Sequence, residues 1–186
     1  MRLRAIVTGT PRSGTKYIAN LLCRLGVNSS HELYFNPFYQ SIAELKHDVE
    51  VSWMAAPFLH ELPPDVLIVH LVRDPLKTIN SLAATGHMKA GNIYADFLFK
   101  HSRTSHPVHS WYRWNMLIEQ CAKSRPYVRI RLEDWAQLRE PYGLDPNSWG
   151  AVDAKYVSED LWREAREMAN RYGYDVLTSS RPEPSA

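Results

Sequence analysis

The stretch VTGTPRSGTKYIANLL, residues 7–22, decides the fold. It starts with apolar residues typical of a buried strand and ends with apolar residues at helical spacing. Between them lies a segment, here named the glycine-rich loop (residues 9–16), which holds two glycines, hydroxyl residues and the cations Arg12 and Lys16. Main-chain N–H groups at the start of a helix bind anions, and the helix dipole adds to this preference. A turn that is rich in glycine for packing reasons is the alternative, but the added hydroxyls and cations favour an anion site.

Length and composition indicate one ordinary globular domain. The chain has 186 residues, of which 45% are hydrophobic and 23% charged, and its net charge is +2, so nothing global indicates nucleic acid or a membrane surface. The N-terminus lacks the apolar stretch of a signal peptide and no run reaches membrane-spanning length, so we expect a soluble, cytoplasmic protein. Cys23 and Cys121 form no CxxC or zinc-type pair, and we expect them to be buried, reduced thiols.

The sequence predicts two strand–turn–helix units. The first has a strand over residues 3–8 and a helix that ends near Gly26. The second has the most apolar strand of the chain, DVLIVHLV at residues 65–72. Asp74 then caps a helix whose first residue is Pro75 and which runs to about residue 84. Between the units, VEVSWMAAPFLHEL predicts a strand followed by a short helix.

The remaining segments complete an α/β pattern. Residues 85–109 show no clean period and are interpreted as a lid or substrate loop. A helix over SWYRWNMLIEQCAK, a strand at residues 127–132, a short helix starting at EDWAQL and a last helix from Ser158 follow. Alternating strands and helices predict one α/β domain over residues 1–178, with a central parallel sheet. Residues 179–186 are expected to be disordered.

The glycine-rich loop departs from the Walker A pattern of NTPases. Gly9 and Gly14 have the Walker spacing, but Thr15 separates Gly14 from Lys16, and no serine or threonine follows the lysine to hold magnesium through its hydroxyl. The motif PRSGT instead resembles the 5′-phosphosulfate loop of sulfotransferases that use 3′-phosphoadenosine 5′-phosphosulfate (PAPS). In that family the pattern is P-K/R-S-G-T-T followed by an aromatic residue. The resemblance implies that the domain is a P-loop-type three-layer sandwich. It also implies that the cofactor is bound by Pro11, Arg12, Ser13, Gly14, Thr15, Lys16 and Tyr17.

A second motif, HLVRDPLKTINSL, resembles the 3′-phosphate motif of the same family. There, an arginine closes a buried strand and a serine follows eight residues later, as Arg73 and Ser81 do here. An arginine at a strand end can pair with a phosphate through two hydrogen bonds, and Lys77 could add charge. A structural Arg73–Asp74 ion pair is the alternative for this motif alone. WYRWNMLIE and RIRLEDW also resemble family segments, whereas the C-terminal Arg-Lys-Gly of cytosolic members has no counterpart.

The resemblance implies sulfuryl transfer from PAPS to an acceptor hydroxyl or amine by in-line displacement, without a metal ion. Arg12 falls on the position of the family's catalytic cation. A general base should accept the acceptor's proton. SSHELYFNP resembles the segment of those members that use a glutamate shortly after the first helix, which makes Glu32 the first candidate. The rivals are His31, Glu50 and His60.

The acceptor is not readable from the sequence. Aromatic residues after Glu32 are expected to shape its pocket and would suit a small molecule such as a phenolic or lipid-like alcohol, or a carbohydrate; they are Tyr34, Phe35, Phe38 and Tyr39. Two other functions stay open. One is a nucleotide kinase or NTPase with a degenerate P-loop, and the other is a nucleotide-binding module without turnover.

Overall fold

The computed structural model describes residues 3–38, 46–136 and 158–174. These residues fall into two compact units. The first comprises the chain up to Val72 together with the segment from Trp114 to Leu132, and the second comprises the rest. Each unit is described by itself below. The single domain expected over residues 1–178 stays a prediction, and the tail at 179–186 lies outside the described residues.

The first unit is built on a five-stranded sheet in the order β2-β3-β1-β4-β5. All four neighbouring pairs are parallel. The predicted α/β class with a central parallel sheet is therefore confirmed. In chain order the strands are β1 (Ala5–Gly9), β2 (Ser29–His31), β3 (Val49–Val51), β4 (Leu67–Val72) and β5 (Tyr127–Arg131).

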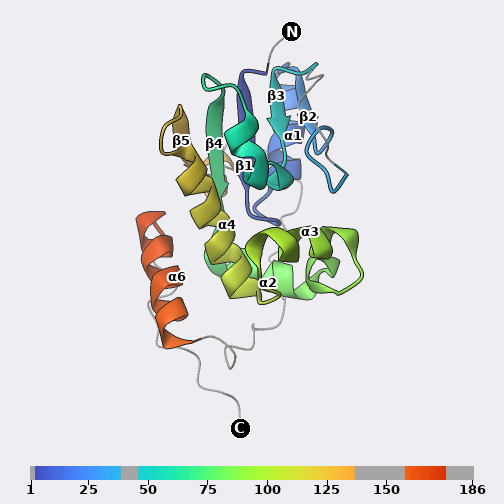
Figure 1. Cartoon of the computed structure of the whole chain (residues 1–186). Coiled ribbons are helices and arrows are strands. Elements are labelled where there is room, and N and C mark those ends of the chain that lie inside the picture. Colours follow the sequence, from blue (N-terminus) through green and yellow to red (C-terminus); the bar gives the residue numbers. More distant parts are fainter. Residues whose placement is uncertain (1–2, 39–45, 137–157, 175–186) are drawn as a thin grey trace. The chain divides into compact units, whose positions relative to one another are not determined.

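Helical elements cover the sheet within this unit. Helix α1 (Thr15–Arg24) lies behind the sheet in Figure 1, and the 3-10 helix η1 (Trp53–Glu61) lies in front of it. Strand β1 is central and its side chains are buried toward both faces, which explains its unbroken apolar run. The second half of α4 (Pro107–Ala122) belongs to the same core, because Trp114 Nε1 donates to the carbonyl of Trp53 at 3.2 Å.

The strand order fixes where a ligand can bind. After β1 the chain continues to β2, which lies on one side of the β1–β4 pair. After β4 it continues to β5, which lies on the other side of this pair. Because β1 and β4 are paired neighbours, their carboxyl ends form a topological switch point. Open parallel sheets bind ligands at such points. The glycine-rich loop follows β1 at this edge.

Most predicted elements are found with small shifts at their ends. The first strand covers Ala5–Gly9 rather than residues 3–8. Helix α1 ends one residue before Leu25, and Gly26 follows with φ 77° in a Schellman-type turn, where Val27 N donates to Leu22 O.

The second unit holds α2, the short 3-10 helix η2, α3, the first turns of α4, and α6. Helix α2 spans Pro75–Ala84, and the Asp74 carboxylate accepts from Lys77 N at its start, as predicted. Helix α6 spans Glu159–Arg171 and is capped by Ser158, also as predicted. The short helix predicted from EDWAQL is α5, which spans Leu132–Ala136.

The interpretation of residues 85–109 as a lid loop was wrong. This segment contains η2 (Gly86–Met88), α3 (Ile93–Ser102) and the start of α4. Helix α3 is capped by Asn92, whose side chain accepts from Tyr94 N at 2.9 Å. Its apolar residues lie on both sides, since Leu98 is buried while Ile93 is 41% exposed, and this hides the helical period.

The expectation for the cysteines was partly wrong. Both are free thiols, but Cys23 is exposed and Cys121 is only half-buried. Cys23 Sγ lies 3.2 Å from Ser29 Oγ instead of packing in the core. In the described part of the chain, no helix combines the length and the apolar character needed to cross a membrane.

Candidate functional site

The glycine-rich loop makes a tight turn between β1 and α1. Two of its residues have left-handed backbones, Arg12 with φ 71° and Gly14 with φ 97°. Gly14 is the N-cap of α1. This helix has neither a side-chain cap nor an acidic residue in its first turn. The first N–H groups of α1 are thus left for another acceptor, and the positive end of the helix dipole is not neutralised locally.

Positive φ at Arg12 is informative because non-glycine residues adopt it at an energetic cost. Such backbone strain is common where a side chain must be held at a functional site. The Arg12 side chain is exposed, as is that of Lys16 at the start of α1. The loop therefore has two exposed cationic side chains, while its backbone is tightly packed.

Tight packing under the loop involves Gly9 and Ser13. A Cβ at Gly9 would lie 2.2 Å from Leu71 O and 2.6 Å from Ser13 Oγ, so no larger residue fits there. Ser13 is fully buried, and its hydroxyl has no hydrogen-bond partner within the described residues. A buried hydroxyl without a partner is costly and calls for an explanation. A polar atom of a ligand or an ordered water molecule would supply that partner.

Gly14 is required for a second reason. A Cβ at this position would lie 2.7 Å from a methyl group of Leu132, which follows β5 and is itself buried. Glycine at position 14 thus permits both the left-handed backbone and the close approach of Leu132 to the start of α1.

Glu32 lies at the same edge of the sheet. It follows β2 directly, and its main-chain N–H donates to Val51 O at 3.1 Å. Its backbone is also left-handed, with φ 51°. Burial raises the pKa of the Glu32 carboxyl to about 7, repulsion from Glu50 adds to the rise, and the charge of Lys16 opposes it. The Lys16 interaction brings the predicted base and the glycine-rich loop into one electrostatic environment.

His31 connects the two segments. Its Nε2 atom lies 3.5 Å from Thr15 Oγ1, the first residue of α1, and 3.5 Å from Glu32 Oε1. Burial lowers the pKa of His31, and the positive charge of Lys16 lowers it further. A neutral imidazole is therefore favoured near neutral pH, with one nitrogen able to donate and the other to accept.

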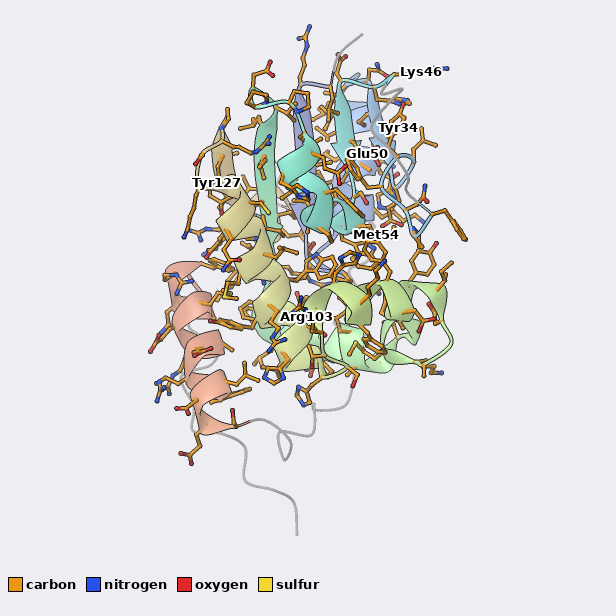
Figure 2. All side chains as sticks on the ribbon, viewed as in Figure 1. Tyr34, Lys46, Glu50, Met54, Arg103 and Tyr127 are labelled. Atoms are coloured by element: carbon orange, nitrogen blue, oxygen red, sulfur yellow. The ribbon has the colours of Figure 1, made fainter. Side chains whose placement is uncertain are left out.

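Glu50 on β3 has a different role from Glu32. Its carboxylate is fully buried and accepts a hydrogen bond from the Ser30 hydroxyl. It also accepts from Leu33 N at 3.0 Å and from Tyr34 N at 3.3 Å, and Figure 2 shows Glu50 beside Tyr34. Burial raises the pKa of Glu50, while these donors and the Phe35 N–H oppose the rise. An acceptor hydroxyl has no access to a carboxylate that is buried and used in this way.

His60 lies at the opposite edge of the sheet. The Arg125 guanidinium, just before β5, donates to His60 O at 3.1 Å and to Pro63 O at 3.0 Å. Both carbonyls therefore lie at the amino-terminal edge of the strands. The His60 side chain is 66% exposed and its Nε2 lies 3.9 Å from Glu61. This geometry gives His60 no part in the chemistry at the glycine-rich loop.

The second predicted motif belongs to the second unit. Arg73 is half-buried directly after β4, and Ser81 is fully buried on α2. The neighbouring turn is held by Glu133, whose Oε1 accepts from Asp74 N at 3.0 Å and whose Oε2 accepts from Tyr174 O–H at 2.6 Å. The start of α2 beside Arg73 is thereby anchored to the segment that follows α6.

The aromatic residues after Glu32 do not form one group. Phe35 is fully buried and stacks on Phe58 at 6.2 Å, so its assignment to the acceptor pocket is not favoured. Tyr34 O–H lies 2.9 Å from His47 Nδ1, and Phe38 is 73% exposed. Tyr39 lies outside the described residues.

In the described residues, no group of three or more His, Cys, Asp or Glu side chains could hold a metal ion. No protein-family model and no curated protein matches the chain. The site is thus defined by its geometry. One feature that sequence reasoning missed is the anchoring by Glu50; an acidic residue between two valines of a buried strand, VEV, was the signal that could have found it.

Proposed function

We propose that the chain is a PAPS-dependent sulfotransferase, with a P-loop-type three-layer fold. One observation carries this proposal: Glu32, a partly buried carboxyl whose pKa is raised by burial to about 7, lies near Lys16 of a glycine-rich loop that does not follow the Walker pattern. A general base is most effective when its pKa is close to the working pH. A phosphate-binding loop beside such a base suits transfer of an anionic group to a hydroxyl or amine.

The glycine-rich loop fits the phosphosulfate end of the donor. The first N–H groups of α1 lack a side-chain cap, and the buried Ser13 hydroxyl lacks a partner in the described residues. Both kinds of group bind the oxygens of an anion. Tyr17, half-buried on α1, would lie near the adenine, a role that rests on the family resemblance. Arg73 and Ser81 are assigned to the 3′-phosphate on the same ground.

In the proposed reaction the acceptor oxygen or nitrogen forms a bond to sulfur, and the bond between sulfur and the bridging oxygen breaks. Adenosine 3′,5′-bisphosphate leaves with the electron pair of that bond. The Glu32 carboxylate accepts the acceptor's proton. Arg12 and the loop N–H groups stabilise the negative charge that grows on the bridging oxygen. Such a mechanism relies on positioning and charge, as phosphoryl transfer does.

Neither alternative function explains Glu32 as well. A P-loop kinase or NTPase holds magnesium through a serine or threonine hydroxyl directly after the loop lysine, and here the much larger Tyr17 occupies that position. In a binding module without turnover, the raised pKa of Glu32 would be a consequence of burial alone, with no catalytic role.

Ligand-dependent stabilisation tests the proposal. Adenosine 3′,5′-bisphosphate at 100 times its dissociation constant should stabilise the protein by about 2.7 kcal/mol, whereas magnesium–ATP should have little effect. Ser13→Ala removes the buried hydroxyl that is proposed to bind the anion, so it should reduce the stabilisation by adenosine 3′,5′-bisphosphate. Stabilisation by magnesium–ATP alone would favour the kinase alternative and contradict the proposal.

A further inference from the structure

The carboxylates of Glu32 and Glu50 form a pair at the carboxyl edge of β2 and β3. In the parallel register Ser30 lies opposite Glu50, and His31 lies opposite Val51. Glu32 directly follows β2, and its main-chain N–H donates to Val51 O at the end of β3. Each carboxyl is raised in pKa by burial, and the charge of Glu50 contributes to the raised pKa of Glu32.

The hydrogen bonds of Glu50 favour its ionised form and so oppose the rise in pKa that burial causes. The Ser30 hydroxyl and the main-chain N–H groups of Leu33 and Tyr34 all donate to its carboxylate. Both N–H groups donate to Oε1, and the hydroxyl contacts Oε2. These three hydrogen bonds satisfy an acidic side chain that is buried in an otherwise apolar strand.

These contacts act on the segment that carries Glu32. Leu33 and Tyr34 follow Glu32 directly, and their N–H groups are turned inward to reach the Glu50 carboxylate. On the other side, the Glu32 N–H is fixed to Val51 O. Glu32 is thus clamped between two anchors on β3, which accounts for its left-handed backbone, φ 51°.

We propose that Glu50 is the positioning residue of the site: its buried carboxylate holds the main chain after Glu32, and so fixes the Glu32 carboxyl beside Lys16 at the glycine-rich loop. This inference rests on the proposed function, because it deepens the role of Glu32 as the base. Glu50 itself does not touch the substrate. Its charge also acts on Glu32 electrostatically, together with Lys16 from α1 and His31 from β2.

Two substitutions separate the anchoring from the charge. Glu50→Gln keeps the shape and one carbonyl acceptor for the N–H groups, but it removes the negative charge. Glu50→Ala removes both. Ser52→Ala is the matched control, since Ser52 Oγ donates to Phe35 O at 2.9 Å and so anchors the same segment without a charge.

The first measurement is a carbon-13 NMR titration of the Glu32 carboxyl in the free protein, with the signal assigned by its loss in Glu32→Gln. The midpoint should move to lower pH in Glu50→Gln, because a repelling charge is removed. It should stay unchanged in Ser52→Ala. An unchanged midpoint in Glu50→Gln, or an equal shift in the control, would overturn the inference. This measurement requires no enzymatic activity.

The second measurement is sulfuryl transfer. Displacement of the base by Glu50→Ala should lower kcat by about 10²-fold, while affinity for adenosine 3′,5′-bisphosphate changes less than about twofold. The acidic limb of the Glu50→Gln rate profile should move to lower pH. Wild-type kinetics in Glu50→Ala would overturn the inference. If the titration midpoint moves as expected but the wild-type protein transfers no sulfuryl group, the Glu50–Glu32 coupling stands and the proposed function fails.

Discussion

The pH dependence of turnover tests the role of Glu32 most sharply. Burial, with a contribution from Glu50, raises the pKa of this carboxyl from an ordinary 4.5 to about 7. A base must be deprotonated to act, so activity should rise as the pH increases through this value. The profile of kcat/KM against pH reports the pKa of the free enzyme.

The structure sets the size of the effect. With a pKa of about 7, the carboxylate fraction of Glu32 is about 0.1 at pH 6 and about 0.9 at pH 8, so kcat/KM should rise about tenfold over this range. With the ordinary pKa of 4.5, the fraction would already be about 0.97 at pH 6 and the profile would be almost flat.

Sulfuryl transfer from labelled PAPS to a fixed acceptor between pH 5 and pH 9 is the assay. Glu32→Gln keeps the size and polarity of the side chain but cannot accept a proton. It should lower turnover by about 10²- to 10⁴-fold while leaving nucleotide binding intact. Full activity with a flat profile in Glu32→Gln would show that Glu32 is not the base. If kcat/KM of the wild-type protein instead rises below pH 5, the conclusion that burial raises the pKa of Glu32 is refuted.

Four further outcomes are expected. Arg12→Ala should lower kcat by roughly 10²-fold with a much smaller loss of product-nucleotide affinity; a raised KM at normal kcat would contradict this. Arg73→Ala should weaken adenosine 3′,5′-bisphosphate by about 2–4 kcal/mol in calorimetry, and equal weakening of adenosine 5′-phosphate would contradict the assignment. Gly14→Ala should destabilise the protein by about 1–3 kcal/mol in urea, because φ is 97° and Leu132 is close; an unchanged midpoint would contradict it. Burial lowers the pKa of His70 to about 4, so its folded value lies below the unfolded 6.5 and stability should fall by about 3 kcal/mol between pH 6.5 and pH 4; if His70→Gln keeps the same pH dependence, this reasoning fails.

The elements that sequence predicted well are those with strong local signals. Strand β4 is an unbroken apolar run, and Asp74 with Pro75 marks the start of α2, so neighbouring residues alone determine the outcome. Helix α3 was missed because its apolar residues lie on more than one side. Leu98 is buried and Ile93 is exposed because of packing within the second unit. The spacing of apolar residues along the sequence does not reveal this packing.

For the site, the sequence predicted which residues would follow the strands but not how they are held. Placement of Glu32 after β2 follows from the parallel topology. Exclusion of Glu50 as a base depends on its pairing opposite Ser30 and on N–H groups donated by the next segment. Such contacts join residues up to 20 positions apart and appear only once the strands are paired.

The central claim is that this chain moves a sulfuryl group from PAPS to an acceptor, with Glu32 as the base. Incubation of the wild-type protein with sulfur-labelled PAPS and a panel of phenolic, carbohydrate and amine acceptors tests it directly. The account predicts that label appears on at least one acceptor in a one-to-one ratio with released adenosine 3′,5′-bisphosphate, and that Glu32→Gln abolishes both. Absence of transfer to every acceptor, together with phosphoryl transfer from magnesium–ATP, would contradict it.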